Sequence, residues 1–183
     1  MVGKYRIVVV TTLCICVGMM CADKAHAASS ALTGEIPVRI TIPTASTSVS
    51  VIKVGVTTTG HLDTPHNFVQ AGWYKLGTLP GNPGNAVIDG HVDNGGSIPG
   101  VFKHLKNVAI GDSVYITQAS GKILHFIVTA TNVYPYTAFP SESVFAPSKD
   151  SLLNIITCDG KWLPKQDTYS DRLVVTAALV SST

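Results

Sequence analysis

The chain has 183 residues, of which 45% are hydrophobic and 13% are charged, and its formal net charge at pH 7 is +2. This length is enough for one folded domain with a sizeable core. The Lys and Arg residues form no cluster, which argues against nucleic acid as a partner, because phosphate binding needs a concentrated positive field.

The first 27 residues are predicted to be a targeting segment. Lys4 and Arg6 precede the uncharged run 7–22, and Ala25-His26-Ala27 fits the small-x-small pattern of a signal-peptidase site. A spanning helix needs about 20 residues, so the run is short for one, and both a cleaved signal peptide and an uncleaved membrane anchor remain open. Either alternative places the protein outside the cytoplasm, on the outer face of the membrane or secreted. A short linker is expected at 28–35 and the folded domain at 36–183.

Most of the folded domain is predicted to be β-structure. Short runs rich in β-branched residues, many alternating apolar with polar positions, indicate strands at 36–42, 48–54, 85–89, 112–119, 122–134, 152–158 and 172–180. Short helices are expected at 100–108 and 141–146. The Thr/Ser-rich stretch 41–50 suits either a linker or the start of the domain. Many strands with little helix favour an all-β sandwich or a closed barrel.

The cysteines suggest where chemistry takes place. Cys14, Cys16 and Cys21 lie in the targeting segment, so the folded domain contains only Cys158. This residue has no internal disulfide partner and is either a buried thiol or a reactive one. A lone cysteine in a strand is more often a small buried hydrophobic residue than a nucleophile.

A catalytic cysteine needs a base or a cation nearby, because a free thiol has a pKa of about 8.5. His91 is the best candidate base: it follows the predicted strand 85–89 through Gly90 and opens a glycine-rich loop, where a side chain can face a cleft. The remaining histidines of the domain suit solvated loops, packing or the surface: His61, His66, His104 and His125. Arg172 begins the last predicted strand, and its alternative role is a salt bridge to Asp171 or Asp167.

The order His91, Cys158, Arg172 and the residues around them resemble the sortases, the extracellular cysteine transpeptidases of bacteria. "NIITC" at 154–158 stands where the family has its Thr-Leu-x-Thr-Cys signature, and "GH" at 90–91 and "DRLVV" at 171–175 stand at its histidine and arginine motifs. The resemblance covers nearly all of 34–181. It is greatest to class F, through "VGVTTTGHLDTP", "AGWYKLGTLPG", "NAVIDGHVD", "GVFKHL", "GDSVYI" and "LLNIITCDG". Asn154 and Ile155 depart from the signature.

The resemblance implies a closed eight-stranded β-barrel of the sortase type with one or two short helices, and a monomeric enzyme with no cofactor and no metal. It implies that Cys158 attacks a Leu-Pro-x-Thr-Gly-like sorting signal between Thr and Gly, that His91 is the general acid and base, and that Arg172 stabilises the oxyanion. The acceptor would be an amine, such as that of a peptidoglycan cross-bridge.

Further residues are weaker candidates for substrate binding. Each has an ordinary alternative in strand formation, loop packing or, for Asp93, an Asx-turn. The candidates are Thr157, Asp93, Ala138, Phe139, Pro140, Val144, Trp162 and Tyr169.

Three alternative functions compete with that of a sortase. An exported L,D-transpeptidase would carry a His-Gly-Cys-type cluster, whereas Ile156-Thr157 precede Cys158. A papain-like hydrolase has its cysteine before its histidine in the sequence. The non-enzymatic alternative is a secreted β-barrel that binds peptide or wall polymer and keeps Cys158 buried and inert.

Overall fold

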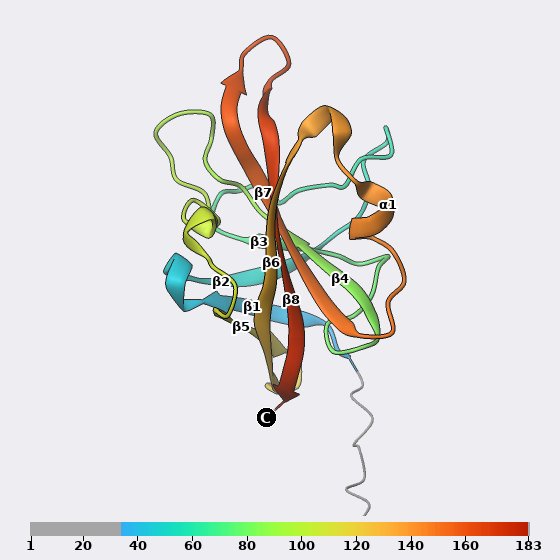
Figure 1. The fold of residues 1–183 in the computed structure, drawn as a ribbon. Coiled ribbons are helices and arrows are strands. Elements are labelled where there is room, and N and C mark those ends of the chain that lie inside the picture. Colours follow the sequence, from blue (N-terminus) through green and yellow to red (C-terminus); the bar gives the residue numbers. More distant parts are fainter. Residues whose placement is uncertain (1–33, 183) are drawn as a thin grey trace, which may run out of the picture. The chain divides into compact units, whose positions relative to one another are not determined.

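The structure is a computed structural model that describes residues 34–182 (Figure 1). The predicted targeting segment, 1–27, lies outside the described residues. The strands are β1 (Pro37–Ile42), β2 (Thr47–Val54), β3 (Ala71–Tyr74), β4 (Gly84–Asp89), β5 (Ser113–Gln118), β6 (Ile123–Pro135), β7 (Ser151–Leu163) and β8 (Thr168–Ser182). They close into a barrel in the order β1-β2-β3-β4-β7-β8-β6-β5. The predicted all-β closed barrel is therefore confirmed.

The sequence patterns locate seven of these strands and miss β3. This strand has only four residues, Ala71–Tyr74, and three of them are buried, so no alternation is visible. The Thr/Ser-rich stretch 41–50 is part of the barrel, because it spans the end of β1, the 3-10 turn η1 (Pro43–Ala45) and the start of β2.

The two predicted helices differ in outcome. The expected helix at 141–146 is present as α1 (Ser141–Val144), a single turn. The helix expected at 100–108 is wrong: only the 3-10 helix η2 (Leu105–Asn107) forms, after a series of turns. Phe102 and Leu105 are both fully buried, three residues apart, a spacing that a 3-10 turn places on one side. None of the helices in the described part is long and apolar enough to cross a bilayer.

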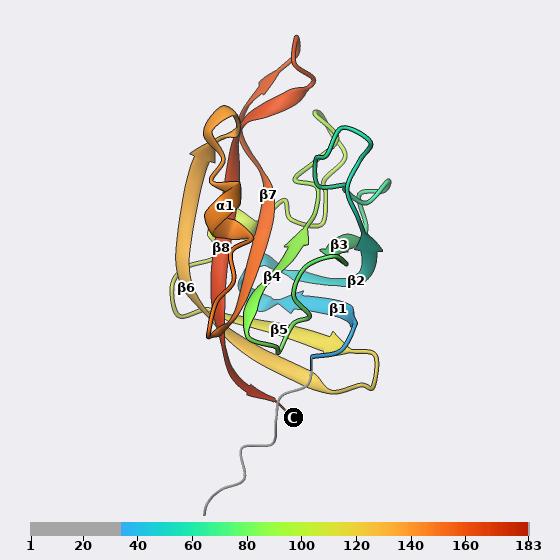
Figure 2. The same cartoon turned by 90° about the vertical axis from the view of Figure 1, so that its right-hand side faces the viewer.

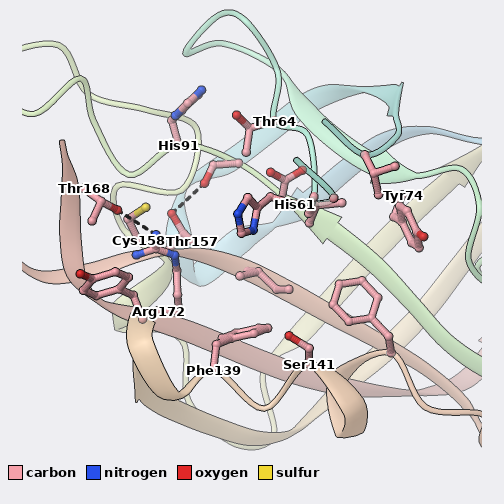
Figure 3. A pocket seen from close by; sticks show the side chains of 18 of the residues that line it. His61, Thr64, Tyr74, His91, Phe139, Ser141, Thr157, Cys158, Thr168 and Arg172 are labelled. Atoms are coloured by element: carbon pink, nitrogen blue, oxygen red, sulfur yellow. Dashed lines mark hydrogen bonds between the residues drawn. The ribbon is translucent and has the colours of Figure 1, made fainter. Parts of the chain in front are cut away.

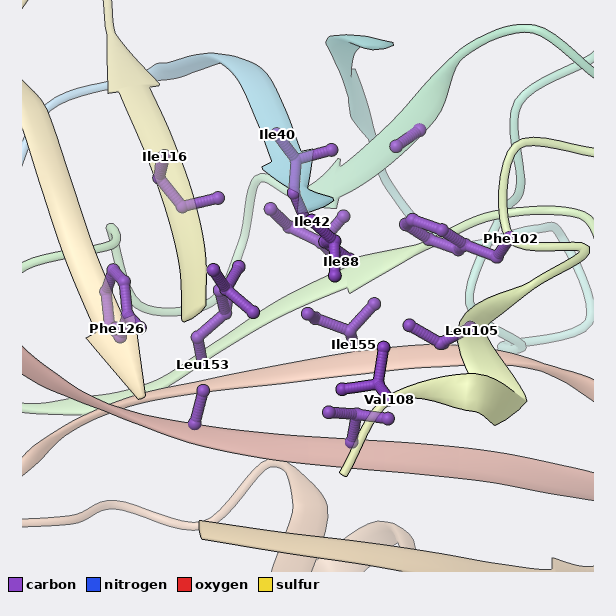
Figure 4. Packing of buried hydrophobic residues seen from close by; sticks show 14 of the residues in the cluster. Ile40, Ile42, Ile88, Phe102, Leu105, Val108, Ile116, Phe126, Leu153 and Ile155 are labelled. Atoms are coloured by element: carbon purple, nitrogen blue, oxygen red, sulfur yellow. The ribbon is translucent and has the colours of Figure 1, made fainter. Parts of the chain in front are cut away.

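The barrel is filled by branched aliphatic and aromatic side chains that point inward from alternate strand positions (Figure 4). Ile40 and Ile42 from β1, Ile88 from β4 and Ile155 from β7 are all fully buried in it. β4 is buried at every one of its six positions. Its inner face lies in this core, and its outer face is covered by the chain between β6 and β7. A strand covered on both faces is rigid and can hold a side chain in a fixed place at its end.

The segment between β6 and β7, which contains α1, is held against the barrel by hydrogen bonds from buried side-chain amides. Asn154 donates to the carbonyl of Val144 at 2.8 Å and to Oδ1 of Asn85 at 3.1 Å. Asn85 in turn donates to the carbonyl of Ala146 at 2.6 Å, and Thr176 donates to Oδ1 of Asn154 at 2.7 Å. The departure from the family signature at Asn154 thus has a structural role.

The structure extends beyond the barrel as a hairpin formed by the ends of β7 and β8 (Figures 1 and 2). β7 pairs with β4 in parallel and with β8 antiparallel, so it lies between them in the barrel wall. The end of β4 therefore lies beside the middle of β7, and the middle of β7 lies beside the first part of β8.

Asn154→Ala is expected to destabilise the protein by about 1–3 kcal/mol, because it leaves buried polar groups of Thr176 and Val144 without a partner. Urea denaturation measures the free energy of unfolding, and hydrogen exchange at 141–146 should rise. The matched control is Asn132→Ala on the exposed face of β6. Equal losses in the two variants would contradict the role given to Asn154.

Candidate active site

An open groove with a cavity volume of about 900 Å³ lies at the end of β4, beside the middle of β7 and the first part of β8 (Figure 3). His91, Cys158 and Arg172, which the sequence identified as candidates, all line it. Three residues distant in the sequence are thus brought to one groove. Its walls come from the loop between β2 and β3 and from the segment between β6 and β7.

Cys158 and Arg172 are held together by strand register. They are direct partners across the antiparallel pair β7–β8, so their side chains lie side by side on the same face of the sheet. Cys158 is half-buried and forms no disulfide.

The guanidinium of Arg172 is fixed by neutral oxygens. It donates to the carbonyl of Asp171 at 2.9 Å, to the carbonyl of Tyr169 at 3.2 Å and to Oγ1 of Thr168 at 2.9 Å. It also lies 5.9 Å from the centre of the Tyr136 ring. In the described residues it forms no salt bridge with a carboxylate, so its positive charge is not neutralised by the protein.

The pKa of the Cys158 thiol is raised, first of all because burial disfavours the thiolate. Arg172 acts in the opposite direction, since its positive charge stabilises the thiolate, while the carboxyls of Asp89 and Asp93 raise the pKa further. At neutral pH the neutral thiol is therefore the main form, and Arg172 is the group that favours its ionisation.

His91 is oriented by the loop between β2 and β3. Its Nε2 lies 2.7 Å from the carbonyl oxygen of Pro65, and its ring packs against Phe68 with 4.6 Å between ring centres. Because a carbonyl oxygen only accepts hydrogen bonds, Nε2 carries the hydrogen, and Nδ1 is the nitrogen left for chemistry. Among the described residues no hydrogen bond joins His91 to Cys158.

Gly90 connects β4 to His91 at a point where neighbouring side chains leave no room for a Cβ atom. A Cβ atom at this position would lie 2.7 Å from side-chain atoms of both Phe102 and Val101, so no larger residue fits. The carbonyl of Gly90 accepts a hydrogen bond of 2.8 Å from the hydroxyl of Thr157. Thr157, a predicted substrate-binding residue, lines the groove, and its hydroxyl ties the histidine loop to the nucleophile strand.

Asp93 is at the centre of a second set of contacts. It accepts hydrogen bonds from Nζ of Lys103 at 2.8 Å, from the backbone N–H of Gly95 at 2.9 Å and from the hydroxyl of Tyr169. The bond from Gly95 is the Asx-turn that the sequence left open. Burial opposes ionisation of Asp93, but these hydrogen bonds outweigh it and lower its pKa.

Trp162 and Tyr169, predicted as substrate-binding candidates, lie on the β7–β8 hairpin and pack edge to face with 5.2 Å between ring centres. Tyr169 reaches Asp93, and Trp162 lies over Gly95. These contacts join the hairpin to the loop after His91. Neither ring is part of the groove lining described above.

One end of the groove is apolar. Val87, Val144, Ile156 and Val174 form a small buried cluster beneath it, with Leu62, Tyr74, Tyr134, Phe139 and Phe145 packed against them. Of the four candidates predicted in the segment after β6, Phe139 lines the groove and Val144 supports it from below. Ala138 is exposed and Pro140 half-buried, and neither belongs to the lining.

A histidine and an aspartate in the groove lining were not identified from the sequence. His61 was assigned to a solvated loop, yet its ring lies in the groove (Figure 3). Asp89 was interpreted only as the last residue of a strand. Burial raises its pKa to about 8, opposed by a hydrogen bond from its own backbone and assisted by the charge of Asp63.

The family model described as "Sortase domain" matches residues 40–180, more than half of the chain. A search of curated proteins found no match.

Solved sortase structures share the fold. Sortase A of Listeria monocytogenes is 23% identical, with a TM-score of 0.60 over 81% of this chain and 90% of that one. Sortase A of Corynebacterium diphtheriae is 25% identical, with a TM-score of 0.60 over 81% of this chain and 62% of that one. Sortase C-1 of Actinomyces oris is 24% identical, with a TM-score of 0.62 over 79% and 75%.

Arg172→Ala is expected to raise the pKa of Cys158 further, because it removes the positive charge that stabilises the thiolate. Alkylation of the folded protein by iodoacetamide, followed by mass spectrometry from pH 6 to 10, should become slower at neutral pH. The matched control is Arg39→Ala on β1, whose side chain is exposed. An unchanged pH profile in Arg172→Ala would refute this role of the arginine.

Asp89→Asn is expected to stabilise the protein at pH 7–8. The folded-state pKa of Asp89 lies above its ordinary value, so its contribution to stability is complete below about pH 4 and is lost as the pH rises towards 8. Each unit of such a shift corresponds to about 1.4 kcal/mol. The difference in unfolding temperature between variant and wild type should therefore grow from pH 4 to pH 8. A constant difference would show that Asp89 ionises normally in the folded state.

Proposed function

Because this chain belongs to the sortase family of cysteine transpeptidases, we propose that it is a class F-like sortase that cleaves Leu-Pro-x-Thr-Gly-like sorting signals between Thr and Gly and joins surface proteins to the cell wall. The observation that carries the proposal is the convergence of Cys158, His91 and Arg172 on one groove with an apolar end.

In the proposed mechanism the thiolate of Cys158 attacks the carbonyl carbon of the threonine. The oxyanion that forms is stabilised by Arg172, whose charge is held beside Cys158 and is not neutralised by a carboxylate. The bond between carbonyl carbon and nitrogen then breaks, the glycine amine leaves with a proton from His91, and a thioester remains on Cys158.

In the second step the thioester is attacked by an amine and not by water. His91 accepts its proton, the nitrogen attacks the thioester carbon, and the C–S bond breaks as the new amide forms, which releases Cys158 as the thiolate. Since Nε2 is bound to the carbonyl of Pro65, Nδ1 is the atom assigned to both proton transfers. The proposed acceptor is a peptidoglycan cross-bridge amine.

The sorting peptide is placed in the groove with its Leu-Pro part at the apolar end. Phe139, Phe145 and Leu62 are the apolar side chains that meet it there. Burial of leucine and proline against such surface stabilises the complex by roughly 25 cal/mol for each Å² removed from water. The enzyme is proposed to act alone, as a monomer, outside the cytoplasm, with residues 7–22 as either a membrane anchor or part of a cleaved signal.

The test is incubation of the full chain with a Leu-Pro-x-Thr-Gly peptide library, with and without an added glycine or diamino-acid amine, followed by mass spectrometry. Cleavage between Thr and Gly with transfer to the amine is expected. Cys158→Ala should abolish it, and His91→Ala should slow it by about 10²-fold or more. His66→Ala, on an exposed loop position, is the matched control.

Absence of an acyl-enzyme on Cys158 with every peptide, from protein shown to be folded by circular dichroism, would contradict the proposed reaction. It would favour the alternative of a β-barrel that binds peptide or wall polymer. An inert thiol in such a barrel should also resist alkylation at neutral pH.

A further inference from the structure

Among the described residues, Thr168 supplies the only side chain that accepts a hydrogen bond from Arg172. Nη1 of the guanidinium donates to the carbonyls of Asp171 and Tyr169, whereas Nη2 donates to Oγ1 of Thr168 at 2.9 Å. The identity of residue 168 therefore decides whether Nη2 has an acceptor. Within the same part of the chain Nε has none, so one N–H on each of Nε and Nη2 stays available for an oxygen of the substrate.

This hydrogen bond lies next to the proposed nucleophile. Thr168 is the first residue of β8 and lines the groove. Side chains alternate along a strand, so Thr168 and Arg172 lie on the same face of β8, and Arg172 is the cross-strand partner of Cys158. Figure 3 shows the hydroxyl of Thr168, the sulfur of Cys158 and the guanidinium of Arg172 together at one end of the groove.

The hairpin that carries Thr168 is bent by a bulge. The register of β7 and β8 shifts after Asp159, where Gly160 and Lys161 lie opposite Ser170. Gly160 has a φ of 82°, which favours glycine, and a Cβ atom there would clash with Ser170. The N–H of Lys161 donates to Oγ of Ser170 at 2.9 Å. A bulge bends a strand pair and increases its twist, so this one helps to set the position of Thr168 over the groove.

Carboxylates flank the same hydrogen bond. Asp167 directly precedes Thr168, and Asp171 directly precedes Arg172. A guanidinium matches a carboxylate with two parallel hydrogen bonds, so either aspartate is an alternative partner for it. In the described residues neither forms a salt bridge with Arg172, and the carboxylate of Asp171 accepts a hydrogen bond of 2.6 Å from Ser170. The neutral oxygen of Thr168 thus holds Nη2 without cancelling the positive charge.

We propose that Thr168 is a positioning residue for the transpeptidase reaction, whose hydroxyl holds the guanidinium of Arg172 beside Cys158 and away from the neighbouring carboxylates. The inference rests on the proposed function and extends it to a residue of the hairpin between β7 and β8. Thr168 acts through Arg172 and needs no contact with the peptide. Its loss should lower kcat and leave KM nearly unchanged, because the oxyanion that Arg172 stabilises forms only after the peptide has bound.

The competing role for Thr168 is that of a wall of the peptide groove. A wall residue contacts the bound peptide before and during the reaction alike, so its loss would raise KM and leave kcat unchanged. It would also leave the ionisation of Cys158 unaltered in the absence of peptide. The division between kcat and KM and the reactivity of the free thiol therefore separate the two roles.

The reactivity of the thiol reports on the charges around Cys158. Arg172 favours the thiolate, whereas the carboxyls of Asp89 and Asp93 disfavour it, and none of these groups is changed by substitution of Thr168. Burial and the bond to Asp93 raise the pKa of Tyr169 to about 12, so its hydroxyl stays neutral from pH 6 to 10. The other ionisable side chains of the groove lining are His61, Tyr74, His91 and Tyr136.

The experiment compares the full chain with Thr168→Val, Thr168→Ala, Thr168→Ser and the double variant Thr168→Val with Arg172→Ala. Valine keeps the size and branching of threonine without the acceptor, alanine is a second variant that lacks it, and serine retains the hydroxyl. The matched control is Thr129→Val on β6, an exposed threonine outside the groove lining whose hydroxyl donates to the carbonyl of Thr176 at 3.2 Å.

Two quantities are measured for each variant whose fold is confirmed by circular dichroism. The constants kcat and KM are determined with the best-cleaved Leu-Pro-x-Thr-Gly peptide and a saturating amine. Alkylation of Cys158 by iodoacetamide, without peptide, is followed by mass spectrometry from pH 6 to 10.

Thr168→Val and Thr168→Ala are expected to lower kcat about tenfold with little change in KM, since a hydrogen bond to a charged group is lost. Alkylation at pH 7 should be about threefold slower, with a smaller effect as the pH rises and the thiolate becomes the main form. Thr168→Ser and Thr129→Val should stay close to the wild type. In the Arg172→Ala background Thr168→Val should add nothing, because the group through which it acts is absent.

Equal effects of valine and serine, a change confined to KM, or full additivity of Thr168→Val with Arg172→Ala in the alkylation rates would overturn the positioning role and leave the transpeptidase intact. Absence of cleavage by the wild-type chain with every peptide would overturn the proposed function instead. The alkylation series needs no peptide, so it would still decide whether Thr168 acts on Cys158 through Arg172.

Discussion

The site depends on the register between β7 and its two neighbours. The antiparallel pairing with β8 sets Cys158 opposite Arg172, and the parallel pairing with β4 brings the histidine loop to the same end of the barrel. A shift of one residue in either pairing would turn the thiol or the guanidinium to the opposite face. The inner core residues of these strands and the buried amides around Asn154 oppose such a shift. Packing in the barrel therefore determines the geometry at its rim.

The groups around Cys158 act in opposite directions on the ionisation of its thiol. Burial and two carboxyls disfavour the thiolate of Cys158, whereas Arg172 favours it. The arginine is held by carbonyl and hydroxyl oxygens, which fix its position without cancelling its charge. An ion pair with Asp171 would have removed that charge from the site. The charge of Arg172 also acts on the substrate. An oxyanion formed at Cys158 lies next to this positive charge, which is already in position to stabilise it.

Much of the molecule follows from short-range patterns in the sequence. Alternation of apolar and polar residues locates seven strands. Cys158, His91 and Arg172 were identified at or just after predicted strand ends, although β7 continues to Leu163 and β8 begins at Thr168. β3 was missed because its four residues are mostly buried and show no alternation of apolar and polar side chains. His61 was missed because a polar loop gives no sign that it folds over a groove, and Asp89 because an acid at a strand end resembles an ordinary turn signal. Such residues are defined by contacts between distant segments, which composition and periodicity do not encode.

The bond between His91 and the carbonyl of Pro65 has a consequence for mutational studies. Its acceptor is a main-chain atom, and every amino acid at position 65 supplies the same oxygen. Alanine at position 65 would leave the contact in place and make Pro65 look unimportant for the histidine. Only a change in the path of the backbone, such as a deletion between β2 and β3, would withdraw the oxygen. Position 65 would then tolerate varied side chains, while the loop would resist a change of length.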